Sequence, residues 1–180
     1  SIQVSKHNAI SISKTTKTPL VEAGEPMQFT LNIGNNAANE MEMIALDGLP
    51  YNGDGRGTSF SGECQVTEMT VKNLDLLQNG LELYYSDSEN DRGKISSNYA
   101  RSDFISGNWK KLSVDSTTGV VTLPQDFQPV AIAAVGMLPA QETLKMDLTM
   151  FLPEGKAGDR AVNSLSCKDL ETEAGSSVVS

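Results

Sequence analysis

The chain has 180 residues, which is enough for one domain with an ordinary hydrophobic core that needs neither a metal nor a disulfide to stabilise it. Its 23 acidic and 14 basic residues give a formal net charge of −9, which argues against nucleic acid or an anionic membrane surface as a partner. No apolar run approaches the roughly 20 residues of a membrane-spanning helix, so we expect no direct membrane insertion. The sequence opens with Ser1 instead of methionine, and we expect it to be part of a longer protein.

Apolar and polar residues alternate along most of the chain, whereas helical periodicity is nearly absent. The alternation is clearest in residues 27–33 and 144–152, and residues 129–135 are apolar on both faces, as in a fully covered inner strand. Many short strands separated by turn residues predict an all-β protein, an antiparallel β-sandwich. The other candidate strands are residues 10–14, 41–49, 65–73, 81–86, 109–114, 119–123 and 161–167.

The remaining segments predict the domain organisation. Residues 10–180 are expected to form one β-sandwich domain, and residues 1–9 a linker or the tail of a preceding domain. The glycine-rich composition of residues 51–62 is unsuited to a strand interior and predicts a long surface loop. The other expected segments are a turn in 19–25, a polar loop in 86–93, a short helical turn in 97–107 and the start of the next connection in 175–180.

Three polar residues share the inward parity of the apolar residues in their predicted strands: Lys14, Asp47 and Asn163. A buried ammonium is expensive unless it is neutralised or paired. A covalent bond removes that cost: an uncharged lysine amine attacks an asparagine carboxamide, ammonia leaves, and an isopeptide bond joins the first strand to the last. This chemistry needs a nearby acid, and Asp47 is the candidate.

Each of the three residues also has an ordinary interpretation. The Lys14 stem can lie on the core while its ammonium reaches water. Asp47 precedes Gly48, and Asp-Gly pairs are common in turns. Asn163 can be a buried amide whose partners are backbone groups. Lys6 is a second candidate nucleophile because it shares the parity of its apolar neighbours Ile2 and Val4. It ranks below Lys14 because it lacks the downstream Thr-Thr pair and Gly24 context.

The order of four segments, residues 12–15, 21–35, 46–50 and 158–164, resembles the conserved-repeat modules of Gram-positive surface proteins. These are immunoglobulin-like domains of the collagen-adhesin and pilin-stalk class, and several of them close an internal Lys–Asn isopeptide bond. The loop 51–62 is similar to a loop of such modules. The resemblance covers nearly the whole chain and implies an immunoglobulin-like β-sandwich with long surface loops.

Carried over to this sequence, the resemblance implies that Lys14 is the nucleophile, Asn163 the electrophile and Asp47 the catalytic acid of isopeptide formation. It implies a structural stalk or repeat module of a bacterial cell-surface adhesin or pilus-like protein, extracellular and attached to the cell surface or cell wall. The expected partners are neighbouring domains of the same protein. We expect no cofactor, no metal and no enzymatic turnover beyond the single self-modification.

The alternative function is a ligand-binding adhesin module that contacts a host glycan or matrix protein through the loop 51–62 and the region of Trp109. An aromatic platform for sugar stacking would use Trp109 with Tyr84, Tyr85 and Tyr99, although core packing is the more frequent use of such residues. A glycoside hydrolase ranks third, because no catalytic carboxylate pair is evident.

Three smaller groups of residues also bear on function. Cys64 and Cys167 lack zinc-ligand spacing, and the inward parity of Cys167 favours free thiols over a disulfide. The only histidine, His7, lies in the expected linker, which argues against catalysis by a histidine-based triad. The acidic residues Asp54, Asp87, Glu89 and Asp91 could bind calcium, but an ordinary solvated loop is the preferred interpretation.

Overall fold

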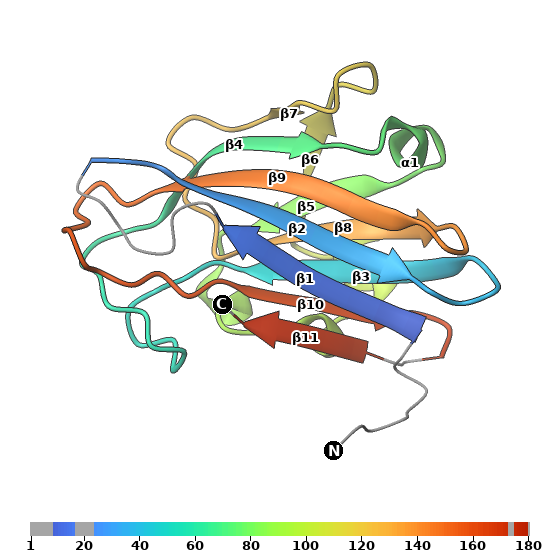
Figure 1. The fold of residues 1–180 in the computed structure, drawn as a ribbon, viewed down its shortest axis with the longest axis horizontal. Coiled ribbons are helices and arrows are strands. Elements are labelled where there is room, and N and C mark those ends of the chain that lie inside the picture. Colours follow the sequence, from blue (N-terminus) through green and yellow to red (C-terminus); the bar gives the residue numbers. More distant parts are fainter. Residues whose placement is uncertain (1–8, 17–23, 173–174, 180) are drawn as a thin grey trace.

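Two antiparallel β-sheets pack face to face in the computed structural model, which describes residues 9–16, 24–172 and 175–179 (Figure 1). The smaller sheet has the strand order β1 (Ile10–Thr16), β2 (Met27–Asn35), β9 (Thr143–Phe151) and β4 (Gln65–Val71). The larger sheet has the order β11 (Gly175–Val179), β10 (Ser164–Asp169), β3 (Met41–Gly48), β8 (Ala131–Leu138), β5 (Glu82–Ser86), β6 (Lys110–Val114) and β7 (Val121–Thr122). This confirms the predicted all-β class and the antiparallel immunoglobulin-like β-sandwich.

The smaller sheet follows from alternation of apolar and polar residues, which is clearest in β2 and in the first half of β9. In β2, Phe29, Leu31 and Ile33 are buried, whereas the residues between them are more exposed. The register pairs Leu31 with Met146 of β9, so that apolar side chains of neighbouring strands stand side by side on the inner face. This face packs against the larger sheet and forms the main core.

The central strands of the larger sheet, β10, β3 and β8, are buried on both faces. The inner residues of β8 belong to the main core, and its outer residues belong to a second apolar cluster. Residues 87–109, which include η2 (Glu89–Asp91), η3 (Ser96–Asn98) and α2 (Arg101–Ile105), cross the outer face and supply Tyr99, Phe104 and Trp109 to that cluster. This cover explains why residues 129–135 are apolar on both faces.

At one edge of the sandwich, β1 of the smaller sheet lies beside β10 and β11 of the larger sheet (Figure 1). Strand β10 pairs with β3 in an antiparallel register that sets Ser164 opposite Gly48 and Leu165 opposite Asp47. Three strands that are far apart in the sequence, β1, β3 and β10, therefore come together at this edge.

Some expectations need correction. The strand predicted over 161–167 begins only at Ser164, and it is not the last strand, because β11 follows it where the next connection was expected. Helix α1 (Leu74–Gln78) was not predicted, whereas η3 and α2 confirm the helical turn expected within 97–107. Residues 1–8, with Lys6 and His7, and most of the turn expected in 19–25 lie outside the described residues. None of the helices within the described ranges is long and apolar enough to span a lipid bilayer.

Candidate functional site

The structure brings Lys14, Asp47 and Asn163 together at the edge where β1 lies beside β10, which pairs with β3. Lys14 lies in β1 and Asp47 near the end of β3, and Asn163 immediately precedes β10. Asp47 and Asn163 are buried, with exposed fractions of 2% and 0%, and Lys14 is half-buried. The inward parity predicted for all three residues is confirmed, and the site connects the smaller sheet to the larger one.

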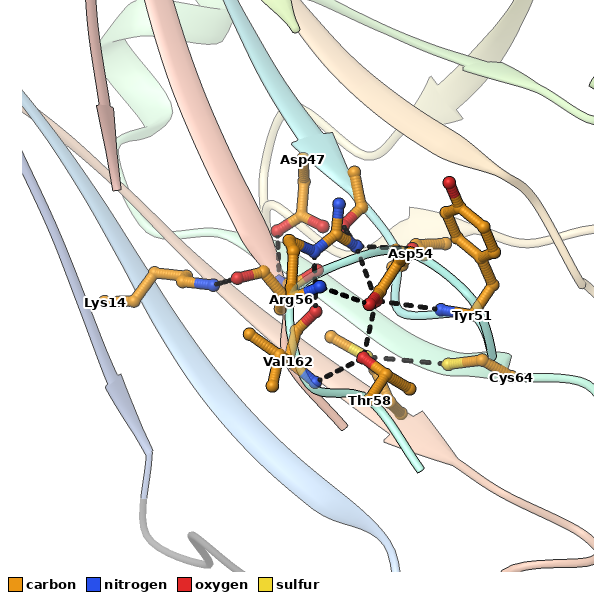
Figure 2. Close-up of polar contacts among 12 residues, drawn as sticks. Lys14, Asp47, Tyr51, Asp54, Arg56, Thr58, Cys64 and Val162 are labelled. Carbon is orange, nitrogen blue, oxygen red and sulfur yellow. Dashed lines mark hydrogen bonds and ion pairs between the residues drawn. The ribbon is translucent and has the colours of Figure 1, made fainter. Parts of the chain in front are cut away.

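Two hydrogen bonds link the three residues. The Lys14 Nζ donates to the backbone carbonyl of Asn163 (Figure 2). The Asn163 Nδ2 donates to Asp47 Oδ2 at 2.5 Å. The centroid of the Phe29 ring lies 5.9 Å from Lys14 Nζ, so this ring is part of the apolar surroundings of the amine.

Burial shifts the pKa of both ionisable groups toward their neutral forms. Desolvation lowers the pKa of Lys14 to about 8, and the nearby positive charge of Arg56 lowers it further, while the Asp47 carboxylate acts in the opposite direction. Desolvation raises the pKa of Asp47 to about 6, against the opposing effects of Lys14, the Asn163 hydrogen bond and Arg56. A free amine and a protonated carboxyl are therefore both accessible near neutral pH.

Two oxygens at this site are buried without a hydrogen-bond partner: Asp47 Oδ1 and Asn163 Oδ1. Buried polar atoms without partners are rare in folded proteins and costly. A half turn of the Asn163 carboxamide exchanges Oδ1 with Nδ2, and a protonated Asp47 then has Oδ1 as its acceptor. In that arrangement the acid polarises the carbonyl beside the lysine amine.

Sequence analysis did not single out Arg56, although its side chain is part of the site. Arg56 comes from the loop 51–62, and its side chain points toward Asp47 and Val162 (Figure 2). Its Nε donates to the Val162 carbonyl at 3.1 Å, and its Nη2 donates to the carbonyls of Gly48 and Leu49 at 3.2 and 3.1 Å. The available sequence signal was an arginine inside a glycine-rich loop, which gives no direction to the side chain.

The two cysteines are buried free thiols located apart from each other. The Cys64 sulfur lies 3.6 Å from that of Met150, and the Cys167 sulfur lies 3.9 Å from that of Met43. Burial raises the pKa of Cys167 to about 12, and it raises the pKa of Cys64 still further. The predicted inward direction of Cys167 is confirmed, and both residues act as small apolar core residues.

The acidic residues considered for calcium each bond to a different partner. Asp54 pairs with Arg56, Asp87 with Lys110, and Glu89 with Arg92. Asp91 accepts hydrogen bonds from Ser86 and Tyr99. Among the described residues, no three His, Cys, Asp or Glu side chains are grouped so that they could hold a metal ion.

The aromatic residues considered for sugar stacking are mostly in the second apolar cluster. Trp109 and Tyr99 are each 7% exposed and pack edge to face with ring centroids 5.3 Å apart. Tyr84 is also buried, and the half-buried Tyr85 packs against Phe127. An exposed platform built on Trp109 is therefore wrong for this structure.

No protein-family model matches the chain, and no curated protein matches it. Similar solved structures include a DUF4466 family protein from Parabacteroides merdae, at 10% identity over 96% of this chain and 43% of that chain, with a TM-score of 0.41. A variant of the major pilin subunit of Bacillus cereus matches at 8% identity over 94% of this chain and 38% of that chain, with a TM-score of 0.35. A type II cohesin domain from the cellulosome of Acetivibrio cellulolyticus matches at 12% identity over 94% of this chain and 83% of that chain, with a TM-score of 0.36.

The chain spans less than half the length of the first two of these structures. Identities and TM-scores this low carry no information about function.

Proposed function

We propose that this domain is a structural module of an extracellular bacterial surface protein, stabilised by a self-formed isopeptide bond between Lys14 and Asn163. The observation that carries the proposal is the meeting of an amine, a carboxamide and a carboxyl at one buried point between the two sheets. Attachment to the cell surface or cell wall, and association with neighbouring domains, belong to the same proposal.

The reaction needs a neutral amine and a polarised carbonyl. The Lys14 nitrogen attacks Cγ of Asn163, while protonated Asp47 donates a hydrogen bond to Oδ1 of the same carboxamide. The bond between Cγ and Nδ2 then breaks, and the departing nitrogen takes the proton released by the lysine nitrogen. The products are a secondary amide and one ammonia, and Asp47 ends in the protonation state in which it began.

Folding supplies the proximity that makes this reaction feasible without another enzyme. The Lys14 amine already contacts the backbone of the residue whose side chain it attacks. Well-oriented intramolecular groups gain roughly 7 to 11 kcal/mol of barrier reduction over free reactants. The domain therefore carries out one self-modification and turns over no external substrate.

Intact-mass measurement of the denatured protein tests the proposal. The expected mass is that of the sequence minus one ammonia, and a protease digest should contain a branched peptide that joins Lys14 to Asn163. Lys14→Ala and Asp47→Ala should retain the ammonia. A wild-type mass equal to that of the sequence, with no branched peptide, would refute the bond.

A further inference from the structure

The loop 51–62 directs its charged side chains inward, to the crosslink site. The Arg56 side chain is 14% exposed and the Asp54 side chain only 1%, although both belong to a loop with a glycine at every second position from 53 to 57. Buried charges in a surface loop are costly unless the structure pairs them. Their burial indicates that this loop has a fixed position on the domain.

The Arg56 guanidinium bridges the backbone beside the acid Asp47 and the backbone beside the crosslink residue Asn163. It donates to the carbonyls of Gly48 and Leu49, which directly follow Asp47, and to that of Val162, which directly precedes Asn163. A planar guanidinium has several donors in fixed directions, so one side chain holds both segments in a defined relation. A lysine ammonium cannot reproduce this geometry.

Two further residues of the loop hold this arrangement in place. Asp54 pairs with Arg56 at 3.3 Å and accepts a hydrogen bond from the Thr58 hydroxyl at 2.5 Å. The Thr58 oxygen in turn accepts from the Val162 N–H at 3.1 Å. Both backbone groups of Val162 are thereby bound by the loop (Figure 2). Val162 directly precedes Asn163 in the chain.

We propose that Arg56 is a positioning residue for isopeptide formation, and that the loop 51–62 is the clasp that must dock before Lys14 and Asn163 react. This inference rests on the proposed function. Arg56 does not touch the reacting atoms; it acts through the backbone that follows Asp47 and the backbone that precedes Asn163. Small displacements of reacting groups slow intramolecular reactions strongly, which gives such a residue a large effect on rate.

The test follows bond formation in newly made full-length protein. The chain is produced by cell-free synthesis, translation is stopped, and samples are quenched in denaturant at intervals for intact-mass measurement of the ammonia loss. Arg56→Met should slow the loss by about tenfold to a hundredfold. Arg56→Lys, which keeps the charge but lacks the planar fork, should also be slower than wild type.

Arg92→Met is the matched control. The guanidinium of Arg92 lies over the Tyr51 ring of the same loop, 4.9 Å from its centroid, and its ion pair is with Glu89. The Arg92→Met change therefore removes an arginine that contacts the loop but leaves the hydrogen bonds to the three carbonyls of Gly48, Leu49 and Val162 in place. The control should form the bond at the wild-type rate.

The pH dependence of the rate separates positioning from a general loss of stability. Within the described ranges, the charged groups that act on the pKa of Lys14 are Asp47 and Arg56, and those that act on the pKa of Asp47 are Lys14 and Arg56. Arg56 lowers both pKa values, so its replacement by methionine should move the whole rate profile to higher pH. Arg56→Lys should leave the profile where it is and lower only its height.

The outcomes distinguish this inference from the proposed function. If the wild type never loses ammonia, the proposed function fails and this inference fails with it. If the wild type loses ammonia and folded Arg56→Met does so equally fast, Arg56 has no positioning role. Equal slowing of Arg56→Met and Arg92→Met would also overturn the inference. Circular dichroism establishes that each variant is folded, and Arg56→Lys provides the test if Arg56→Met does not fold.

Discussion

Replacing Asp47 by Asn removes the acid of the proposed reaction while nearly keeping the shape of the side chain. We expect the variant to fold and to retain the ammonia that the wild type loses. The new amide at position 47 still gives the Asn163 side chain a polar neighbour in place of the carboxylate. The substitution therefore removes the acid and changes the packing little. The protein should then melt at a lower temperature, because its two sheets are no longer joined covalently.

The size of the effect follows from the length of chain that the bond encloses. Lys14 and Asn163 are 149 positions apart. Crosslinking a loop of that length lowers the entropy of the unfolded chain, which raises the free energy of unfolding by about 5 kcal/mol in the loop-entropy model. For a domain of this size, such a loss lowers the melting temperature by about 10 to 20 °C. Any strain that the crosslink introduces into the folded state reduces this difference in melting temperature.

The assay combines intact mass with thermal unfolding followed by circular dichroism. Asp91→Asn is the matched control, since Asp91 is an acid bonded to Ser86 and Tyr99, away from the site. It should keep the crosslink. Lys14→Met should cost about as much stability as Asp47→Asn, and the double variant little more than either, because both changes remove the same bond. Fully additive losses in the double variant would refute this reasoning.

Three further predictions concern rate, thiols and packing. The crosslinking rate should peak near pH 7: raising the pH through about 8 deprotonates Lys14, and raising it through about 6 deprotonates Asp47, so the rate falls on both sides. A profile that rises steadily to pH 10 would exclude an acid role for Asp47. Cys64 and Cys167 should resist a thiol reagent in the folded protein and react after denaturation without reductant; a failure to react then would indicate a disulfide. Phe104→Ala should cost about 3 to 5 kcal/mol in urea unfolding followed by the fluorescence of the single tryptophan, and an unchanged midpoint would show that the second cluster contributes little.

Much of the fold could be predicted because its strands are local patterns. Period-two alternation located β2 and β9, and the apolar run of β8 identified an inner strand. Helix α1 was missed because its five residues are too few to establish a helical period. Strand β11 was missed because Gly175 and two serines begin it, and these residues are common in linkers.

The candidate site was partly predictable for the same reason. Side-chain parity in three predicted strands identified Lys14, Asp47 and Asn163 without knowledge of which strands are neighbours, although Asn163 immediately precedes β10 in the structure. Arg56 could not be found in this way, because a loop has no parity and its side-chain directions depend on tertiary contacts. The same limit applies to Trp109, whose burial depends on the path of residues 87–109 across the outer face of the larger sheet.

The positions of Lys14 and Asn163 also bear on resistance to proteases. With the proposed bond in place, residues 14–163 form a closed ring, and the surface segments 51–62 and 87–93 both lie within it. A single cut in either loop opens the ring but leaves the two fragments covalently attached through the isopeptide bond. The strands on either side of the cut stay paired with their neighbours in the sheets, and the fragments cannot diffuse apart. A domain built this way survives a nick that would divide an ordinary β-sandwich into two dissociable pieces.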